Sequence, residues 1–556
     1  MEKVGEVEGV EATLPEPDDR SSARSGAVAL LVAGVIIVAA VAPIADLIEF
    51  LLPTRGEVSS RGTAFRSFAD VGEQVVRRTG AVVALAALAS LVVGRLRWSS
   101  DGRLHRGFGS ALAPLLMIVG AVWYGWLGNP HNGFPTNARI HWVDFETSRV
   151  DDFFYAAGRL PHWIFYDVPY VWQAINAAIV VGLAFAIGRR LGLSTLGAAA
   201  MGATPLVATN LLLFADTAED VLLNTALLLF VCLAALRREP VTLGVALTMA
   251  VLGRPSFLIL GACVAVGEAL GELRRTSSVR AATRELFSRY VVVTGAVTVV
   301  GIIVSQAVME ILGDRYFFVD GKIIDTGPLS SAEPVEVEGF VISAFSGAYL
   351  AHLVWMMPLT FLVGTVYAVV RASRLPEPIE RFVYFGAAAA VVVLVVHESQ
   401  PLLYYNVRYL TYVWPFLFVT AWAGFAALRV GSARPSLHAA VVVALFAGSL
   451  AVPADPVGLK RTIEARPDVE LLEVRDELRA LGDDGFIAMT FGSRSSRNFM
   501  AYVMRSGGWT IHSGADAADV GWLVISMRDE PWSDRSPDIE TDSLVIHVAQ
   551  PSDLAG

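Results

Sequence analysis

The chain has 556 residues, of which 54% are hydrophobic and only 17% are charged. Soluble globular proteins carry about 25% charged residues, so the composition excludes that class and indicates a polytopic membrane protein. The two cysteines, Cys232 and Cys263, both lie in apolar runs, which argues against a disulfide framework or a thiolate metal site. The net charge of −10 is concentrated in residues 453–556, which hold 18 acidic and 10 basic side chains.

Residues 1–24 hold seven acidic and three basic side chains and have no apolar period. Such a segment cannot bury enough apolar surface to fold, so we expect a short disordered tail. It lacks the basic start and directly following apolar core of a signal peptide.

A membrane body follows this tail. A spanning helix needs about 20 apolar residues to cross roughly 30 Å of hydrocarbon, and the sequence predicts thirteen candidate spans. The two short runs at 241–252 and 255–270 are separated only by Gly253 and Arg254, so two spans and one broken hairpin are both open. The candidate spans lie near residues 26–51, 80–94, 107–127, 169–188, 194–213, 219–236, 241–252, 255–270, 290–310, 347–370, 382–396, 409–428 and 438–452.

Arginine density at the span ends predicts the orientation. One set of alternate loops carries 18 Lys and Arg in 60 residues, whereas the other carries 12 in 124. The arginine-rich set should be cytoplasmic. An odd number of spans then places the N-terminus inside and residues 453–556 outside a prokaryotic plasma (inner) membrane, on the same side as the long loops 128–168 and 311–346.

The predicted fold class is therefore an α-helical polytopic membrane protein of about 13 transmembrane helices with a C-terminal extracytoplasmic α/β domain. Within that domain, short apolar runs predict strands at Phe486 to Phe491, Trp522 to Met527 and Leu544 to Ala549, with a helix at 495–506. The predicted domains are a cytoplasmic tail (1–24), two additional N-terminal transmembrane helices (25–106), a transmembrane core (107–452) and the outer domain (453–556).

Loop 128–168 mixes acidic and aromatic residues, as an amphipathic segment on a membrane surface would. Within it, the segment from Asp151 and Asp152 to Arg159 looks like a helix, and its acidic first turn suits the positive end of the helix dipole. The dipole alone explains the pair, and a catalytic role is the alternative. Three histidines, His131, His141 and His162, make a metal site conceivable, although scattered histidines are more often hydrogen-bonded surface residues.

A second acidic group lies between the fifth and sixth candidate spans. Asp216, Glu219 and Asp220 occupy a turn that needs only one or two capping residues. Carboxylates at a span boundary are costly against lipid, so a cavity-facing role is a functional hypothesis.

Two arginines occupy the predicted outer ends of spans. Arg408, followed by Tyr409 and Tyr412, has the planar donor fork that binds a lipid phosphate; snorkelling to headgroups is the alternative. Arg254 precedes Pro255, which breaks a helix and frees backbone groups beside a positive charge.

These segments occur in an order that resembles the GT-C superfamily of integral-membrane glycosyltransferases, which includes the lipid A aminoarabinose transferases and protein O-mannosyltransferases. Asp151-Asp152-Phe-Phe-Tyr155-Ala resembles the acidic motif of its first outer loop, and Asp220-Val-Leu-Leu resembles its second acidic site. The segments Gly244 to Pro255 and Arg408-Tyr409 to Pro415 resemble its junction and its late Arg-Tyr-Pro motif. The resemblance covers roughly 107–428 and the outer domain, so the first two spans lie outside it.

The resemblance implies transfer of a sugar from a polyprenyl-phosphate donor to a glycan, lipid or protein acceptor at the outer membrane face, with no nucleic acid involved. It implies Asp152 or Asp151 as general base. Asp220, Asp216 and Glu219 would position the acceptor or a divalent cation (Mg, Mn or Ca), and Arg408, Arg254 and Tyr409 would bind the donor phosphate.

Two rival functions come from other classes. A transporter or lipid flippase would use buried carboxylates and a discontinuous helix such as 241–270, but the two halves of the chain show no pairing. A membrane scaffold without catalysis predicts that the acidic groups tolerate substitution.

Overall fold

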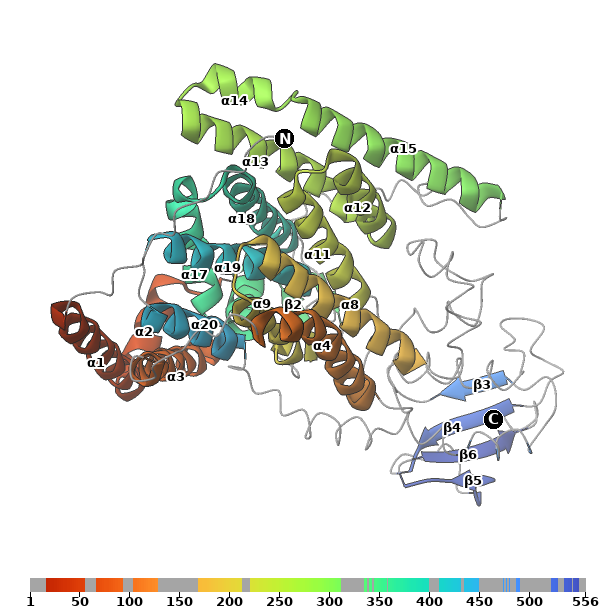
Figure 1. Cartoon of the computed structure of the whole chain (residues 1–556). Helices are drawn as coiled ribbons and strands as arrows, with labels where there is room; N and C mark the ends of the chain where they lie inside the picture. The colour runs from red at the N-terminus through yellow and green to blue at the C-terminus, as the bar shows by residue number, and fades with distance from the viewer. Residues whose placement is uncertain are drawn as a thin grey trace.

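The computed structural model shows a bundle of helices and a small sheet that lies at one side of it (Figure 1). The described residues are 17–55, 67–93, 104–128, 169–212, 221–311, 335–337, 340–342, 345–357, 359–399, 410–431, 435–449, 474, 477, 480, 487–490, 522–528, 535–542 and 544–549.

Every one of the thirteen candidate ranges contains a helix. The helices are α1 (Pro17–Ala39), α2 (Val41–Leu51), α3 (Phe68–Val93), α4 (Leu104–Gly128), α8 (Pro169–Arg190), α9 (Thr195–Ala203), η1 (Thr204–Leu206), α10 (Thr209–Leu212), α11 (Val221–Arg237), α12 (Pro240–Gly253), η2 (Pro255–Leu258), α13 (Ile259–Thr276), α14 (Val279–Glu285), α15 (Arg289–Ile311), α16 (Ala348–Met356), α17 (Leu359–Arg371), η4 (Ala372–Arg374), α18 (Glu377–Glu398), α19 (Trp414–Gly431) and α20 (Pro435–Ser449). Since α1 begins at Pro17, residues 17–24 of the expected tail are helical.

The chain is thus a mostly helical polytopic membrane protein. Five helical segments of the described residues are long and apolar enough to cross a membrane, or seven if two bent pairs each count as one span. Four shorter apolar helices of 10–17 residues accompany them. The number of thirteen crossings stays a prediction.

Three of the candidate spans are broken rather than continuous. The range 26–51 is α1 and α2, bent by 77°, and the range 347–370 is α16 and α17, bent by 99°. The range 194–213 divides into α9, η1 and α10. Prolines explain the breaks, because Pro43, Pro205 and Pro358 each lack the N–H that a continuous helix needs. Apolar length predicted these helices, and proline position decided where they end.

Helix α2 has three distinct faces. Val41 and Ala45 are buried, and Gly72 of α3 lies against Ala45. Leu47 and Phe50 are exposed on a second face, and Glu49 lies on a third. A helix with a protein face, an apolar face and an acidic face suits the membrane interface.

The helices differ in how deeply they are buried. All of the Leu410–Leu428 window is buried, including the large rings of Trp414 and Trp422, whereas only 17% of the Val279–Ser305 window is buried. Helix α15 lies along one edge of the bundle (Figure 1) and exposes Val299 and Ile303. Helix α19 is therefore central, and α15 is peripheral with an apolar face suited to lipid.

Residues 241–270 form a helical hairpin. Arg238, just before α12, is ion-paired with Glu268 in α13, so the chain returns to the same end of the bundle. The turn at Arg254 lies one length of α12 away, which is about 20 Å at about 1.5 Å per residue. Two spans and one broken hairpin would both bring the chain back in this way, so the number of crossings made by 241–270 stays a prediction.

The C-terminal region contains a four-stranded sheet of order β3-β4-β6-β5. Its strands are β3 (Ile487–Thr490), β4 (Trp522–Met527), β5 (Ile539–Glu540) and β6 (Leu544–Ala549), and a separate hairpin comprises β1 (Val335–Val337) and β2 (Phe340–Ile342). The three predicted strands are confirmed as β3, β4 and β6, whereas the short β5 and the hairpin were missed. Strands β3 and β4 are parallel and so need a crossover connection; the helix predicted at 495–506 lies in that connection, outside the described residues.

Candidate functional site

Arg254 lies where α12 ends. Its backbone is extended, with φ −153° and ψ 119°, because a residue that precedes proline is disfavoured in the helical region. Its N–H still donates to the carbonyl of Ala250 at 2.8 Å. The Arg254-Pro255 dipeptide therefore ends α12 and directs the arginine side chain away from the helix ladder.

A hydrogen bond joins Arg254 to the segment that precedes α19. The Nε of Arg254 donates to the Oη of Tyr412 at 2.8 Å, and the guanidinium carbon lies 5.2 Å from the centre of the Tyr412 ring. Phe257 contacts the same ring edge-on, with centroids 5.2 Å apart. The phenol thus fixes the orientation of the guanidinium at its Nε.

Asn224 adds a third element, the first turn of α11. Its Nδ2 donates to the Oη of Tyr412 at 3.4 Å, and both side chains are almost fully buried. A Cβ on Gly253 would lie 2.5 Å from the Oδ1 of Asn224, so only glycine fits before Arg254. We call Asn224, Arg254, Phe257 and Tyr412 the arginine–tyrosine cluster.

This cluster joins segments that the sequence singled out separately. Arg254 belongs to the junction motif, and Tyr412 belongs to the segment from Arg408 to Pro415. Asn224 lies four residues after Asp220. Three stretches far apart in the chain therefore meet at one end of the bundle.

Sequence reasoning proposed Arg254 and noted Tyr412 but missed Asn224 and Phe257. Asn224 carries the only amide side chain of α11, and an amide in an apolar helix needs a buried partner. That signal was available. The partner was not, because it lies 188 residues away in the sequence.

The other proposed site residues lie outside the described residues. They are Asp151, Asp152, Asp216, Glu219, Asp220, Arg408 and Tyr409, with the loop histidines His131, His141 and His162. In the part of the chain that the structure describes, no group of three or more His, Cys, Asp or Glu side chains is arranged to hold a metal ion. The divalent cation stays a prediction.

Two residues at the end of α18 contact the start of α16. The ring of His397 lies 6.0 Å from that of Tyr349, centre to centre. Glu398 accepts hydrogen bonds from the backbone N–H groups of Gly347 at 3.1 Å and Leu350 at 2.7 Å. Glu398 therefore caps the N-terminus of α16.

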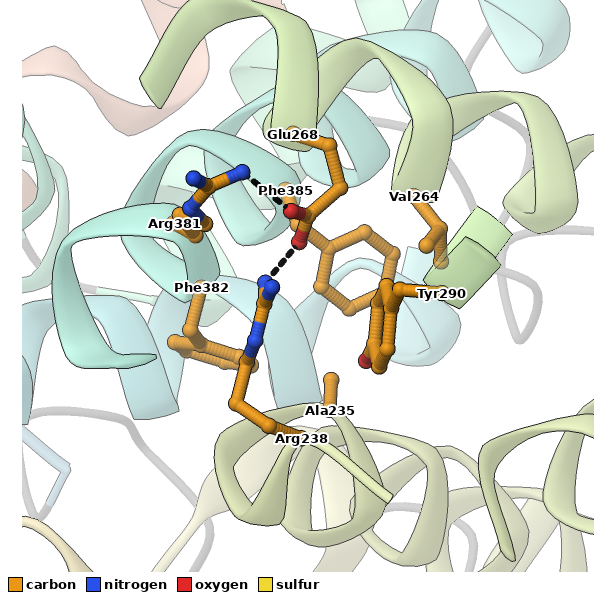
Figure 2. A pocket seen from close by; sticks show the side chains of 8 residues that line it. All are labelled: Ala235, Arg238, Val264, Glu268, Tyr290, Arg381, Phe382 and Phe385. Carbon is orange, nitrogen blue, oxygen red and sulfur yellow. Dashed lines mark hydrogen bonds and ion pairs between the residues drawn. The ribbon is translucent and has the colours of Figure 1, made fainter. Parts of the chain in front are cut away.

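A second group of charged residues lies at the opposite end of α11 (Figure 2). The carboxylate of Glu268 is ion-paired with both Arg238 and Arg381. The Arg238 guanidinium also lies 4.3 Å from the centre of the Tyr290 ring. These side chains line a small pocket with Val264, Phe382 and Phe385. Further ion pairs join Arg381 to Glu272, Glu285 and Glu377, and Arg275 to Glu272 and Glu377.

We call this second group the carboxylate–arginine network, and its arginines are ion-paired with carboxylates of the same group. The side chains of Glu268 and Arg381 are 5% and 6% exposed, so each charge needs its partner. The arrangement binds helices α13, α14 and α18 to one another and to the end of α11. Glu268 is a lone carboxylate within the predicted span 255–270, and that pattern predicts a buried partner.

Comparisons with known proteins give one structural match to report. No family model matches the sequence, and no curated protein matches it. The fold is similar to that in the crystal structure of ArnT from Cupriavidus metallidurans in the apo state, with 12% sequence identity, a TM-score of 0.48, and coverage of 81% of this chain and 98% of that chain. The resemblance expected from the sequence is to the GT-C superfamily, which includes the aminoarabinose transferases, and the structural match is to ArnT. The likeness concerns the path of the chain, and no residue role is carried over from it.

Proposed function

We propose that this chain is a GT-C-like glycosyltransferase that moves a sugar from a polyprenyl-phosphate donor to a glycan, lipid or protein acceptor at the extracytoplasmic face. The observation that carries the proposal is the hydrogen bond from Arg254 to Tyr412. It brings the junction motif and the Arg-Tyr-Pro segment together at the end of the bundle that the arginine distribution assigns to the outside.

Arg254 supplies what a departing phosphate needs. Breaking the bond between the anomeric carbon and the phosphate oxygen leaves negative charge on the lipid phosphate, which a fixed cation stabilises. Tyr412 accepts a hydrogen bond from the Nε of Arg254, which fixes the guanidinium at this end of the bundle. Arg408 and Tyr409, which precede Tyr412 in the same segment, would add a second cation and a hydroxyl.

The acidic residues would activate and position the acceptor. Asp152, or its neighbour Asp151, would take the proton from the acceptor hydroxyl as it attacks the anomeric carbon. Asp220, Asp216 and Glu219 would position the acceptor or a divalent cation. Asn224 supports this assignment for Asp220, since it places the start of α11 beside Tyr412.

One observation favours the transporter alternative. The breaks at Arg254-Pro255 and between α16 and α17 are discontinuities of the kind that form substrate sites in transporters. The two functions differ in products, because a transferase leaves a glycosylated acceptor and a free lipid phosphate, whereas a transporter leaves its cargo chemically unchanged.

Mass spectrometry of lipid-linked sugars and surface glycans separates the two. Cells that lack the gene should accumulate one polyprenyl-phosphate sugar and lose one glycan modification. The same species should return to normal with the wild-type gene. A cargo that is displaced across the membrane but chemically intact would support transport and contradict the transferase.

The outer location of the site has its own test. A cysteine placed at Ser513 should label with a membrane-impermeant maleimide in intact cells or spheroplasts, because the arginine distribution places residues 453–556 outside. Protection at this position, with labelling after permeabilisation, would reverse the orientation and place the arginine–tyrosine cluster inside.

A further inference from the structure

Helix α16 is a nine-residue helix held at both ends by charged side chains from other elements. At its N-terminus, the Glu398 carboxylate accepts from the N–H groups of Gly347 and Leu350. A carboxylate at this end and a cation at the other both stabilise a helix dipole.

The cation at the other end comes from α3. The Nη1 of Arg78 donates to the carbonyl oxygen of Trp355 at 3.1 Å. The Nη2 of Arg78 donates to the Oε1 of Gln74 at 2.9 Å, and the Nε1 of Trp355 donates to the same oxygen at 3.0 Å. Because α16 ends at Met356, the Trp355 carbonyl cannot continue a helix ladder, and Arg78 satisfies it.

Arg78 lies inside α3, a helix that is long and apolar enough to cross a membrane. Arg78 lies ten residues into α3, about 15 Å from its start at about 1.5 Å per residue, and an unsatisfied charge at such a position is costly. The adjacent Arg77 has a different role, since its side chain is 65% exposed and pairs with Glu73 at 3.7 Å on the same helix. Arg78 joins α3 to α16, and Arg77 pairs within α3.

Helix α16 is connected to the arginine–tyrosine cluster through α18. The ring of Tyr349, in the first turn of α16, lies 6.0 Å from that of His397 in α18, centre to centre. Helix α18 also packs against α11, which carries Asn224, and against α19, which follows Tyr412. A shift or loosening of α16 therefore reaches the cluster through α18.

We infer that Gln74 and Arg78 are positioning residues for the candidate site, and that α3 is a brace for the discontinuous helix α16. The brace itself stands on the contacts above; its consequence for donor binding rests on the proposed function. The first two candidate spans lie outside the sequence resemblance, so this role belongs to a part of the chain that the resemblance does not explain.

Hydrogen–deuterium exchange of the full chain in lipid nanodiscs tests the brace. In Arg78→Gln, the amides of residues 352–357 should exchange about tenfold faster, because α16 loses a hydrogen bond to a charged group at its end. Arg77→Gln is the matched control and should leave these rates at the wild-type value. Equal rates in Arg78→Gln and wild type would overturn the brace.

Two substitutions of Gln74 separate positioning from general damage. Gln74→Glu keeps an acceptor for both Arg78 and Trp355 and should preserve α16 exchange, whereas Gln74→Leu should accelerate it as Arg78→Gln does. Exchange that is equally fast in both Gln74 variants would contradict the shared-acceptor arrangement.

Undecaprenyl phosphate serves as the probe for the site. Its apparent affinity, measured by thermal shift of the purified chain, should fall about tenfold in Arg78→Gln and in Gln74→Leu and be retained in Gln74→Glu and Arg77→Gln. Unchanged affinity in Arg78→Gln would overturn the positioning role even if α16 exchanged faster. Absence of binding by the wild-type chain would count against the proposed function, while the exchange comparison would still decide the brace.

Discussion

The two ends of α11 hold arginines in opposite ways. At one end, Arg381 and Arg238 share the buried carboxylate of Glu268. At the other, about 20 Å away by helix rise, Arg254 is oriented by the neutral hydroxyl of Tyr412. Carboxylates hold the arginines at the first end, whereas a phenol holds the Nε of Arg254 at the second.

This difference indicates that one end of α11 holds helices together and that the other end binds a ligand. A guanidinium saturated by carboxylates has nothing left for a phosphate, and its removal leaves buried anions behind. A hydrogen bond to a phenol fixes the rotamer of a guanidinium, which lowers the entropy cost of binding an anion. We therefore expect substitutions at the carboxylate–arginine network to change stability, and substitutions at the arginine–tyrosine end to change activity.

The largest effect should come from the acidic pair assigned to the outer end. Adjacent residues on a helix diverge by about 100°, so only one of Asp151 and Asp152 can face a cavity. Asp152→Asn should lower the transfer rate about 10²- to 10⁴-fold, as expected for loss of a general base, with thermal stability near wild type. Asp151→Asn is the control and should retain most activity.

If both purified variants transfer sugar at rates within a few-fold of wild type, neither aspartate is the general base. The helix-dipole interpretation of the pair would then stand.

At the network, Arg381→Ala should destabilise the chain by about 3–5 kcal/mol, because it leaves the buried Glu268 carboxylate short of a partner. Arg275→Ala is the matched control: its side chain is 44% exposed, and an exposed pair contributes about 0–1 kcal/mol. Denaturation of both variants in mixed micelles measures the difference. If Arg381→Ala, Arg275→Ala and wild type have the same free energy of unfolding, the network does not stabilise this end of the bundle.

The arginine–tyrosine end should respond in affinity rather than in folding. Arg254→Lys keeps the charge but loses the Nε that Tyr412 orients, so the KM for the donor should rise about tenfold, as for a lost charge-assisted hydrogen bond. Arg408→Lys should act in the same direction, with activity partly restored at high donor concentration. Arg289→Lys, at the exposed start of α15, is the control.

An unchanged donor KM in Arg254→Lys and Arg408→Lys would favour snorkelling of both side chains to lipid headgroups. It would also contradict the assignment of donor binding to the arginine–tyrosine end of α11.

The sequence predicted the helices better than their continuity. Each apolar run that is long enough to be a candidate span contains a helix, as burial in lipid requires. Breaks such as that between α16 and α17 depend on Pro358 and on partners such as Arg78 and Glu398, which lie far away in the chain. Local composition does not contain such pairings.

The candidate site shows the same limit. Arg254 was predictable from a charge beside a proline at a span end. Its contact with Tyr412, 158 residues away, was not. Glu268 and Arg381 were visible as charges at span ends, but their pairing over 113 residues required the fold.

The smallest effect concerns a titratable group outside the helices. His547 in β6 lies opposite Val524 of β4 and is 1% exposed. Burial lowers its pKa from the ordinary 6.5; Asp538 opposes the shift and Arg535 adds to it. A lowered pKa means that the unfolded strand binds a proton more readily than the folded one. The stabilisation of the neutral ring is therefore fully present above pH 6.5 and is lost as the pH falls through the lowered folded-state pKa.

Exchange of the amides of residues 544–549, corrected for the intrinsic rate at each pH, should accordingly accelerate between pH 7.5 and pH 5.5. His547→Gln carries no titrating ring, so its exchange should lose this pH dependence even if the strand is weaker at every pH. Arg381 gives no comparable dependence in this range, because a guanidinium stays protonated there. If wild type and His547→Gln show the same slope, a group other than His547 governs the pH response of the sheet.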